Sequence, residues 1–197
     1  SAPHAQDAVV PDPAVPDAAT PDGFADAQAA RRKSLAIIVG NSLGVALYGS
    51  RKWWDDGLRS TFRTTNEGWF AQDTFSGGAD KLGHFYFNYA SARLFVHAFR
   101  WAGNDERNSR ALAAWLALGT FTAVEVVDGF SKRWRFSTQD ALMNVAGVGA
   151  ALLFENNPRL DELVHLRFMS WPSHESGEGA DPVGDYSGQT YLVALKG

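Results

Sequence analysis

Most of the apolar residues lie in four segments of helix length, at residues 35–48, 80–102, 111–128 and 138–156. Polar loops separate these segments, and Pro158 blocks continuation of the last one. None of them is a clean stretch of the roughly 20 apolar residues that a membrane-spanning helix needs. The pattern predicts an all-α fold, a small helical bundle of about four main helices joined by an aromatic-rich connecting segment.

The two ends of the chain differ in composition from the helical region. Residues 1–30 hold five of the eight prolines and no lysine or arginine, and they contain few large apolar side chains. Such composition predicts a disordered acidic tether over residues 1–33, either a plain flexible tail or a spacer that holds the protein off a surface. A helical envelope domain would then cover residues 34–170. An extended, loop-like tail would cover residues 171–197, with a β-prone end at residues 189–195.

The overall composition excludes some functions. The net charge of −4 gives no basis for a nucleic-acid partner. The chain has no cysteine, which excludes disulfides, thiolate metal sites and a cysteine nucleophile within it. No motif defines a set of metal ligands, and the sequence names no cofactor.

Small residues recur one helical turn apart in two of the apolar segments. Gly40 and Gly44 lie in the first segment, and Gly147 and Ala151 lie in the last. This spacing lets two helices approach closely. We therefore expect residues 35–48 to form a buried or membrane-interfacial helix, with a spanning helix as the less favoured alternative.

The connecting segment, residues 51–81, is polar, glycine-punctuated and rich in aromatic residues. Trp53 and Trp54 follow Arg51 and Lys52, and Trp69 and Phe70 come later in the same segment. Tryptophan beside basic residues is typical of a membrane–water boundary, so Trp53, Trp54, Trp69 and Phe70 are candidate membrane-interface residues. The alternative is that these rings pack as lids on a small helical core.

Polar residues occur in pairs on the faces of otherwise apolar helices. Asp80 and His84 share one face of a helix, with Lys81 about 100° around that helix. A second pair lies in the next segment and a third in the last, and these are Glu125 with Asp128 and Asp140 with Asn144. Buried charges need partners, so we expect these seven residues to face one shared polar cavity, with Asp140 at its rim and Lys81 or His84 as the partner of Glu125. Taken singly, several of them have structural alternatives, because Asp80 or Ser137 could cap a helix and Asp128 could close a turn.

The loop between the last two helical segments contains a candidate anion-binding site. Arg133 and Arg135 flank Trp134, and Ser137 is placed to begin the following helix. The arginine side chains could pair with Asp128 and Glu125, or they could bind an anionic headgroup together with the backbone N–H groups at Ser137.

Three motifs together resemble a known family. They are "GADKLGHFYFNYASAR", "EVVDGFS" and "FSTQDALMNVAGVGAAL". They resemble the YfiM-like family of predicted periplasmic lipoproteins, a family of unknown function, and more distantly the VanZ-like membrane proteins. The resemblance covers roughly residues 53–155 and the terminal "DYSGQTY". It implies a helical fold and a membrane-associated location on the periplasmic side of the bacterial cell envelope.

Three functions are compatible with these features. The favoured one is a non-enzymatic envelope protein whose polar cluster organises the fold and contacts a lipid headgroup or glycan, with a membrane lipid or an envelope protein as partner. The second is a hydrolase or transferase on an envelope lipid or glycan, in which Asp80, His84, Glu125 and Asp140 supply acid–base chemistry or hold a hard divalent metal. The third is an integral membrane protein of the VanZ-like type.

Overall fold

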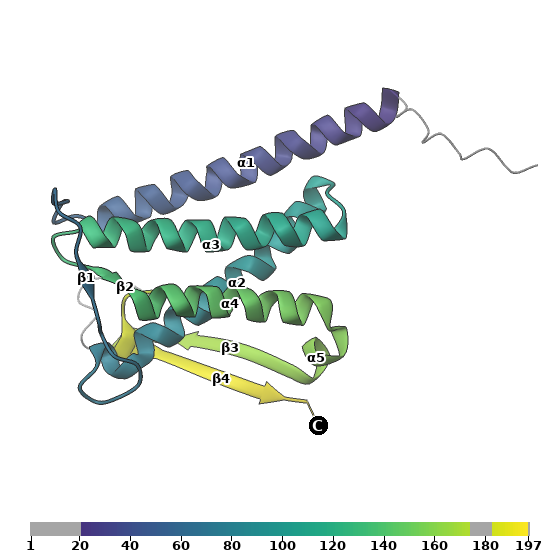
Figure 1. Cartoon of the computed structure of the whole chain (residues 1–197). Helices are drawn as coiled ribbons and strands as arrows, with labels where there is room; N and C mark the ends of the chain where they lie inside the picture. The colour runs from purple at the N-terminus through teal and green to yellow at the C-terminus, as the bar shows by residue number, and fades with distance from the viewer. Residues whose placement is uncertain (1–20, 174–182, 197) are drawn as a thin grey trace, which may run out of the picture.

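The computed structural model describes residues 21–173 and 183–196 of the chain. The described part is mainly α-helical, with four long helices and one short one, and two small sheets distinguish it from the predicted all-α fold (Figure 1). The helices are α1 (Pro21–Lys52), α2 (Ala79–Ala102), α3 (Glu106–Phe130), α4 (Thr138–Asn156) and α5 (Pro158–Leu163). Two short 3₁₀ helices, η1 (Phe75–Gly78) and η2 (Tyr186–Gly188), lie in the connecting segments.

The first helix begins earlier than the sequence predicts. The composition of residues 21–33 predicts that they belong to the acidic tether, but these residues form the first part of α1. Pro21 is compatible with this helix start because proline is tolerated in a first turn, and the alanine-rich residues that follow are good helix formers. Only residues 1–20 of the predicted tether remain, and they lie outside the described residues.

Two small sheets supplement the helices. Strands β1 (Thr64–Thr65) and β2 (Phe136–Ser137) pair in parallel and hold the connecting segment against the start of α4. Strands β3 (Val164–Ser170) and β4 (Gln189–Leu195) form an antiparallel pair. The β-prone end predicted at residues 189–195 therefore coincides with β4, whereas its partner β3 lies in a region that was expected to be helical.

The core forms where α2 packs between α3 and α4. Its buried apolar side chains are Tyr89, Ala92, Val96 and Phe99 of α2, Ala113 and Ala117 of α3, and Val148, Ala151 and Phe154 of α4. The backbones of α2 and α4 come very close at Gly147, where a Cβ atom would lie 2.2 Å from the carbonyl oxygen of Phe85. Close approach of these two helices, predicted from Gly147 and Ala151, is thus observed.

Helix α1 lies along the outside of the bundle, beside α3 (Figure 1). Asn41 of α1 donates a hydrogen bond to Thr120 of α3 at 2.8 Å. Gly40 and Gly44 are not close to another helix as Gly147 is, because no atom of the described chain would lie within 4 Å of a Cβ at either position. The close helix contact predicted for this glycine pair is therefore not made within the described chain.

Among the described residues, only α3 is both long and apolar enough to cross a membrane, and 22% of its most apolar window is buried. Its outer side presents Trp115 and Val126. A helix that is central in the sequence thus leaves much of its apolar surface uncovered.

Candidate functional site

Four helix ends meet at one end of the bundle (Figure 1, left). Helices α1 and α3 end there, and α2 and α4 begin there. The side chain of Ser137 caps α4 by accepting a hydrogen bond from the backbone N–H of Asp140 at 3.3 Å, as predicted. Asp80 has no such role, because α2 begins after Gly78, a glycine with a φ angle of 89°. The carboxylate of Asp80 is therefore free to point into the site.

His84 lies at the centre of the site and contacts three helices. Its Nδ1 atom lies 3.0 Å from Oδ1 of Asn144 and 3.5 Å from a carboxylate oxygen of Glu125. Its Nε2 atom lies 3.7 Å from Asp80 and 4.0 Å from Asp140. The predicted convergence of the α2, α3 and α4 side chains is therefore present, and His84 is the group that faces Glu125.

Lys81 occupies a separate, fully buried position beside His84. Its ammonium group forms ion pairs with Asp80 at 2.7 Å, with Asp140 at 2.9 Å and with Glu67 of the connecting segment. Lys81 is 0% exposed and Asp140 is also buried, so Asp140 belongs to the centre of the site and not to its rim as predicted. Because Lys81 contacts these three carboxylates, it is not the partner of Glu125.

Burial and charge shift the protonation equilibria of the site. Burial raises the pKa of Glu125 to about 8, although the charge of His84 acts in the opposite direction. Burial likewise raises the pKa of Asp128 to about 6, against a hydrogen bond from Trp54. For His84, burial lowers the pKa, but the negative charges of Asp140, Glu125 and Asp80 outweigh it and raise the pKa above its ordinary value. The site thus favours a charged histidine and disfavours ionisation of Glu125 and Asp128.

An amide pair links α2 to α4 under His84. Asn88 is fully buried, and its Nδ2 atom donates to Oδ1 of Asn144 at 2.6 Å and to the backbone oxygen of His84 at 2.9 Å. The oxygen of Asn144 therefore lies close to both the amide of Asn88 and the ring of His84. These contacts orient the histidine ring toward the carboxylates.

The four candidate membrane-interface residues divide into two pairs. Trp54 donates a hydrogen bond from Nε1 to Asp128 at 2.6 Å, and the backbone oxygen of Trp53 accepts one from Trp134 at 2.9 Å. Trp53 and Trp54 are half-buried, so they are lids on the polar site. Trp69 and Phe70 are 45% and 56% exposed and remain available at the surface.

The candidate anion-binding residues also divide. Ser137 is buried, and its backbone N–H donates to Glu125 at 3.3 Å. The predicted role of this N–H group in binding an external anion is therefore wrong. Arg133 and Arg135 are exposed. The predicted pairing of these arginines with Asp128 or Glu125 is not found, since neither forms an ion pair in the described chain. The guanidinium group of Arg133 instead lies 4.8 Å from the centre of the Trp134 ring.

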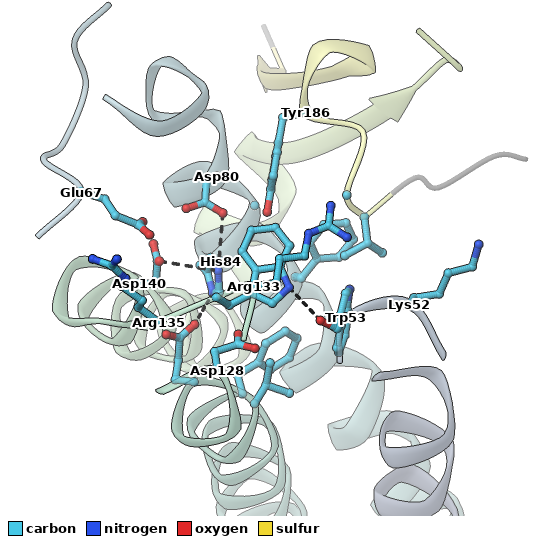
Figure 2. Close-up of a pocket in the computed structure, with 18 residues that line it drawn as sticks. Lys52, Trp53, Glu67, Asp80, His84, Asp128, Arg133, Arg135, Asp140 and Tyr186 are labelled. Carbon is cyan, nitrogen blue, oxygen red and sulfur yellow. Dashed lines mark hydrogen bonds and ion pairs between the residues drawn. The ribbon is translucent and has the colours of Figure 1, made fainter. Parts of the chain in front are cut away.

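These residues enclose a cavity of about 190 Å³ (Figure 2). Carboxylates and His84 form its polar floor, aromatic rings line it, and three exposed cationic side chains also contribute to its lining. The carboxylates that line it are Glu67, Asp80, Glu125, Asp128 and Asp140, the aromatic residues are Trp53, Phe87, Phe121, Trp134 and Tyr186, and the cationic residues are Lys52, Arg133 and Arg135.

The centre of the cavity also has the residue types of a cation site. Ligand atoms of Asp80, His84 and Asp140 lie within 4.8 Å of one another. Carboxylate and imidazole are suitable ligands for several divalent metals. The ammonium group of Lys81 already binds two of these carboxylates, so a metal ion here would share them with a buried cation.

Several residues of the site were not predicted from the sequence, and three of them contact its charged centre. Glu67 lies in an irregular loop, where no periodicity marks it. Asn88 lies one helical turn after His84, and the pattern of Asp80, His84 and Asn88 on one face was the available signal. Tyr186 comes from η2 near the C-terminus and points toward Asp80 (Figure 2). Its contact with the site depends on tertiary structure that local sequence does not encode.

Fold and site together define a mainly helical protein with a buried cluster of carboxylates, a lysine and a histidine at one end of its bundle. A family model described as "Predicted periplasmic lipoprotein (DUF2279)" matches residues 66–156, slightly less than half of the chain. The matched region contains every charged residue of the cavity floor. No curated protein and no solved structure matches the chain. The match confirms the resemblance to predicted periplasmic lipoproteins and the predicted location in the periplasmic part of the cell envelope.

Proposed function

We propose that this chain is a non-enzymatic envelope protein of the YfiM-like type that lies against a membrane and binds the polar headgroup of an envelope lipid in its cavity. The observation that supports this best is the position of the cavity. Its charged floor lies at the end of helices whose outer faces are apolar. A lipid has the same arrangement, because its polar headgroup is followed by apolar acyl chains.

The size of the cavity favours a headgroup over a longer glycan. A volume of about 190 Å³ is below the roughly 300–1,000 Å³ of pockets that enclose drug-sized ligands. The walls are aromatic and the polar groups converge on a small region around His84. A small polar group attached to a chain that leaves the cavity fits this shape better than several linked sugars.

Exposed apolar side chains support contact with the membrane. Helix α1 presents a stripe at successive turns, formed by Leu35, Val39, Leu43 and Leu47. Helix α3 adds Trp115 and Val126, and α4 adds Leu142, Val145 and Leu153. Water-soluble monomers rarely expose large contiguous apolar patches, and membrane contact is one of the usual reasons for apolar side chains that gather at a surface.

Flotation of the purified chain with liposomes of envelope lipids tests this proposal. We expect the protein to float with the vesicles at physiological salt and to be released by sodium carbonate at high pH, as a surface-bound protein is. Retention after carbonate extraction would instead support the VanZ-like alternative, in which α3 crosses the bilayer. Complete recovery in the vesicle-free fraction at low and physiological salt would contradict membrane binding.

The cluster of Asp80, His84 and Asp140 supports a second candidate function. It could hold a divalent metal, or act as an acid and base, in a hydrolase or transferase acting on an envelope lipid or glycan. Elemental analysis of the purified protein and calorimetric titration with Mn²⁺ and Zn²⁺ distinguish this candidate. Stoichiometric metal that is lost in His84→Ala would support it, and the absence of binding would contradict its metal-dependent form.

A further inference from the structure

The charges that face the cavity are separated in space. Five carboxylates line it, Glu67, Asp80, Glu125, Asp128 and Asp140, whereas the cations within its floor are Lys81 and His84. Lys81 contacts Glu67, Asp80 and Asp140, and His84 shares two of the same carboxylates. The floor therefore carries more negative than positive charge.

Asp128 is the carboxylate with the weakest compensation. Its Oδ1 atom accepts a hydrogen bond from Trp54, a neutral donor, at 2.6 Å. No ion pair joins Asp128 to a cation anywhere in the described residues. Burial raises the pKa of Asp128, and no ion pair to this carboxylate within the described chain offsets that effect.

The outer part of the cavity has the opposite imbalance. Lys52 and Arg133 line it, and neither forms an ion pair with a carboxylate within residues 21–173 and 183–196. Figure 2 shows both on the side of Trp53, with Arg133 between that tryptophan and the carboxylates. Arg133 also packs on the ring of Trp134, which holds its guanidinium group at the cavity. Lys52 and Arg133 thus bring positive charge, unpaired within the described chain, to one side of the cavity, whereas its floor carries more negative charge.

We propose that the cavity binds a phosphoethanolamine group, with the ammonium directed inward to Asp128 and the phosphate directed outward to Arg133 and Lys52. This inference rests on the proposed function and names the class of headgroup. Carboxylates accept strong hydrogen bonds from an ammonium group, and Trp53 and Trp134 can add cation–π attraction. The guanidinium fork of arginine is well shaped for phosphate oxygens.

The same charges discriminate among headgroups. A primary ammonium donates hydrogen bonds that satisfy the carboxylates, whereas the quaternary ammonium of choline donates none and is bulkier. A glycerol headgroup has no cation, so its phosphate would bring further negative charge to an already negative site. We therefore expect selectivity for ethanolamine over both choline and glycerol.

Isothermal titration calorimetry of the full chain tests the selectivity. The ligands are dihexanoyl phosphatidylethanolamine, dihexanoyl phosphatidylcholine and dihexanoyl phosphatidylglycerol, each below its micellar concentration, and free phosphoethanolamine. We expect the ethanolamine lipid to bind at least 10-fold more tightly than the other two lipids. Equal affinity of free phosphoethanolamine would support the same binding chemistry with a soluble or glycan-borne source, and weaker binding of the free compound would support the lipid.

Two variants test the recognition of the ammonium and of the phosphate separately. Asp128→Asn should reduce the preference for ethanolamine over choline by about 10-fold, and Arg133→Gln should weaken all phosphate-containing ligands together. Glu162→Gln and Arg167→Gln, exposed positions on α5 and β3, are the matched controls and should change neither result. Circular dichroism melting checks that each variant is folded.

The outcomes distinguish this inference from the proposed function. Equal binding of the three lipids would overturn the ethanolamine assignment while leaving headgroup binding intact. Preference for phosphatidylglycerol would overturn the charge assignment within the cavity. No binding of any of the four compounds by a folded protein would overturn both headgroup binding and its assignment, whatever the flotation result.

Discussion

At the scale of single residues, Lys81 is the most constrained charge in the protein. It is fully buried, and its ammonium group contacts Glu67, Asp80 and Asp140. Burial lowers its pKa, but the hydrogen bonds to these three carboxylates outweigh burial and keep the group charged. Its long side chain therefore links the connecting segment, α2 and α4 at one point.

Replacement of Lys81 should consequently destabilise the fold. Lys81→Met keeps much of the side-chain volume but strands the buried carboxylates, which should lower the free energy of unfolding by about 3–5 kcal/mol. Lys132→Met is the control, because Lys132 is exposed, and it should change stability by less than about 0.5 kcal/mol. Urea denaturation measures both. A loss below about 1 kcal/mol in Lys81→Met would show that the ion pairs contribute little.

Glu125 gives the stability of the protein a defined dependence on pH. Its pKa is about 8 in the fold against 4.5 as its ordinary value, so between these values the folded chain binds more protons than the unfolded chain. The free energy of unfolding should therefore fall as the pH rises from about 4.5 to about 8. The raised pKa values of Asp128 and His84 act in the same direction.

Urea titrations at pH 5, 6, 7 and 8 test this dependence. The wild-type chain should become less stable at each step, and Glu125→Gln, which cannot ionise, should show a shallower decline. Stability that rises over this range would contradict the assigned protonation of the site.

Most of the charged residues at the centre of this site could be predicted from the sequence because they recur at helical spacing. Asp80 with His84, Glu125 with Asp128 and Asp140 with Asn144 were found because helical spacing places each pair on one face. The specific partners could not be predicted, because they depend on helix rotation. His84 and not Lys81 faces Glu125, and Asp140 is central although it was expected at the rim.

At the scale of elements, helix ends with clear local signals were predictable. Helix α4 has the predicted bounds, because Ser137 caps its start and Pro158 follows its end. Strand β3 was not predictable in the same way, since its residues acquire strand geometry by pairing with β4, which lies about twenty residues further along the chain. The early start of α1 was missed because the prolines and aspartates dominate the composition of the first thirty residues, although Pro21 is the last of these prolines.

Helices α2 and α4 approach closely at Gly147, and substitution tests the contribution of this glycine. Gly147→Ala would place a Cβ atom 2.2 Å from the carbonyl oxygen of Phe85, so the helices would have to separate, at a cost of about 1–3 kcal/mol. Gly149 lies half a turn away on α4, and a Cβ there would meet no atom within 4 Å. Gly149→Ala should therefore stabilise the helix by about 0.5–1 kcal/mol.

If this packing is correct, thermal melts should show a lower melting temperature for Gly147→Ala and a higher one for Gly149→Ala. A shift of both melting temperatures in the same direction would contradict it. The comparison is direct because both substitutions are made in one helix and add the same methyl group.

At the scale of the whole molecule, the middle parts of three long helices carry no charged side chain. No Asp, Glu, Lys or Arg occurs in residues 34–50 of α1, 111–124 of α3 or 141–154 of α4. Basic residues flank the stretch in α1, with Arg31, Arg32 and Lys33 before it and Arg51 and Lys52 after it. An uncharged middle between charged ends matches the arrangement of a membrane interface, with apolar side chains toward lipid and basic ones toward phosphates.

The apolar stripe on α1 allows a test of which face meets the membrane. Val39 and Leu43 are 53% and 58% exposed and belong to this stripe. Replacing both by serine should weaken vesicle binding by 10-fold or more, because roughly 1.5–3 kcal/mol is associated with burial of each such side chain. The free energy of unfolding should change little, since these side chains contact few others in the fold.

The matched control is on the opposite side of the molecule. Val193 and Leu195 of β4 are 67% and 75% exposed, and β4 lies across the bundle from α1 (Figure 1). Serine at both positions removes a similar apolar area from the hairpin face. If only the α1 variant loses vesicle binding, that face meets the lipid and the cavity lies at one end of the contact. If the β4 variant alone loses binding, the protein is oriented the other way and the assignment of α1 is wrong.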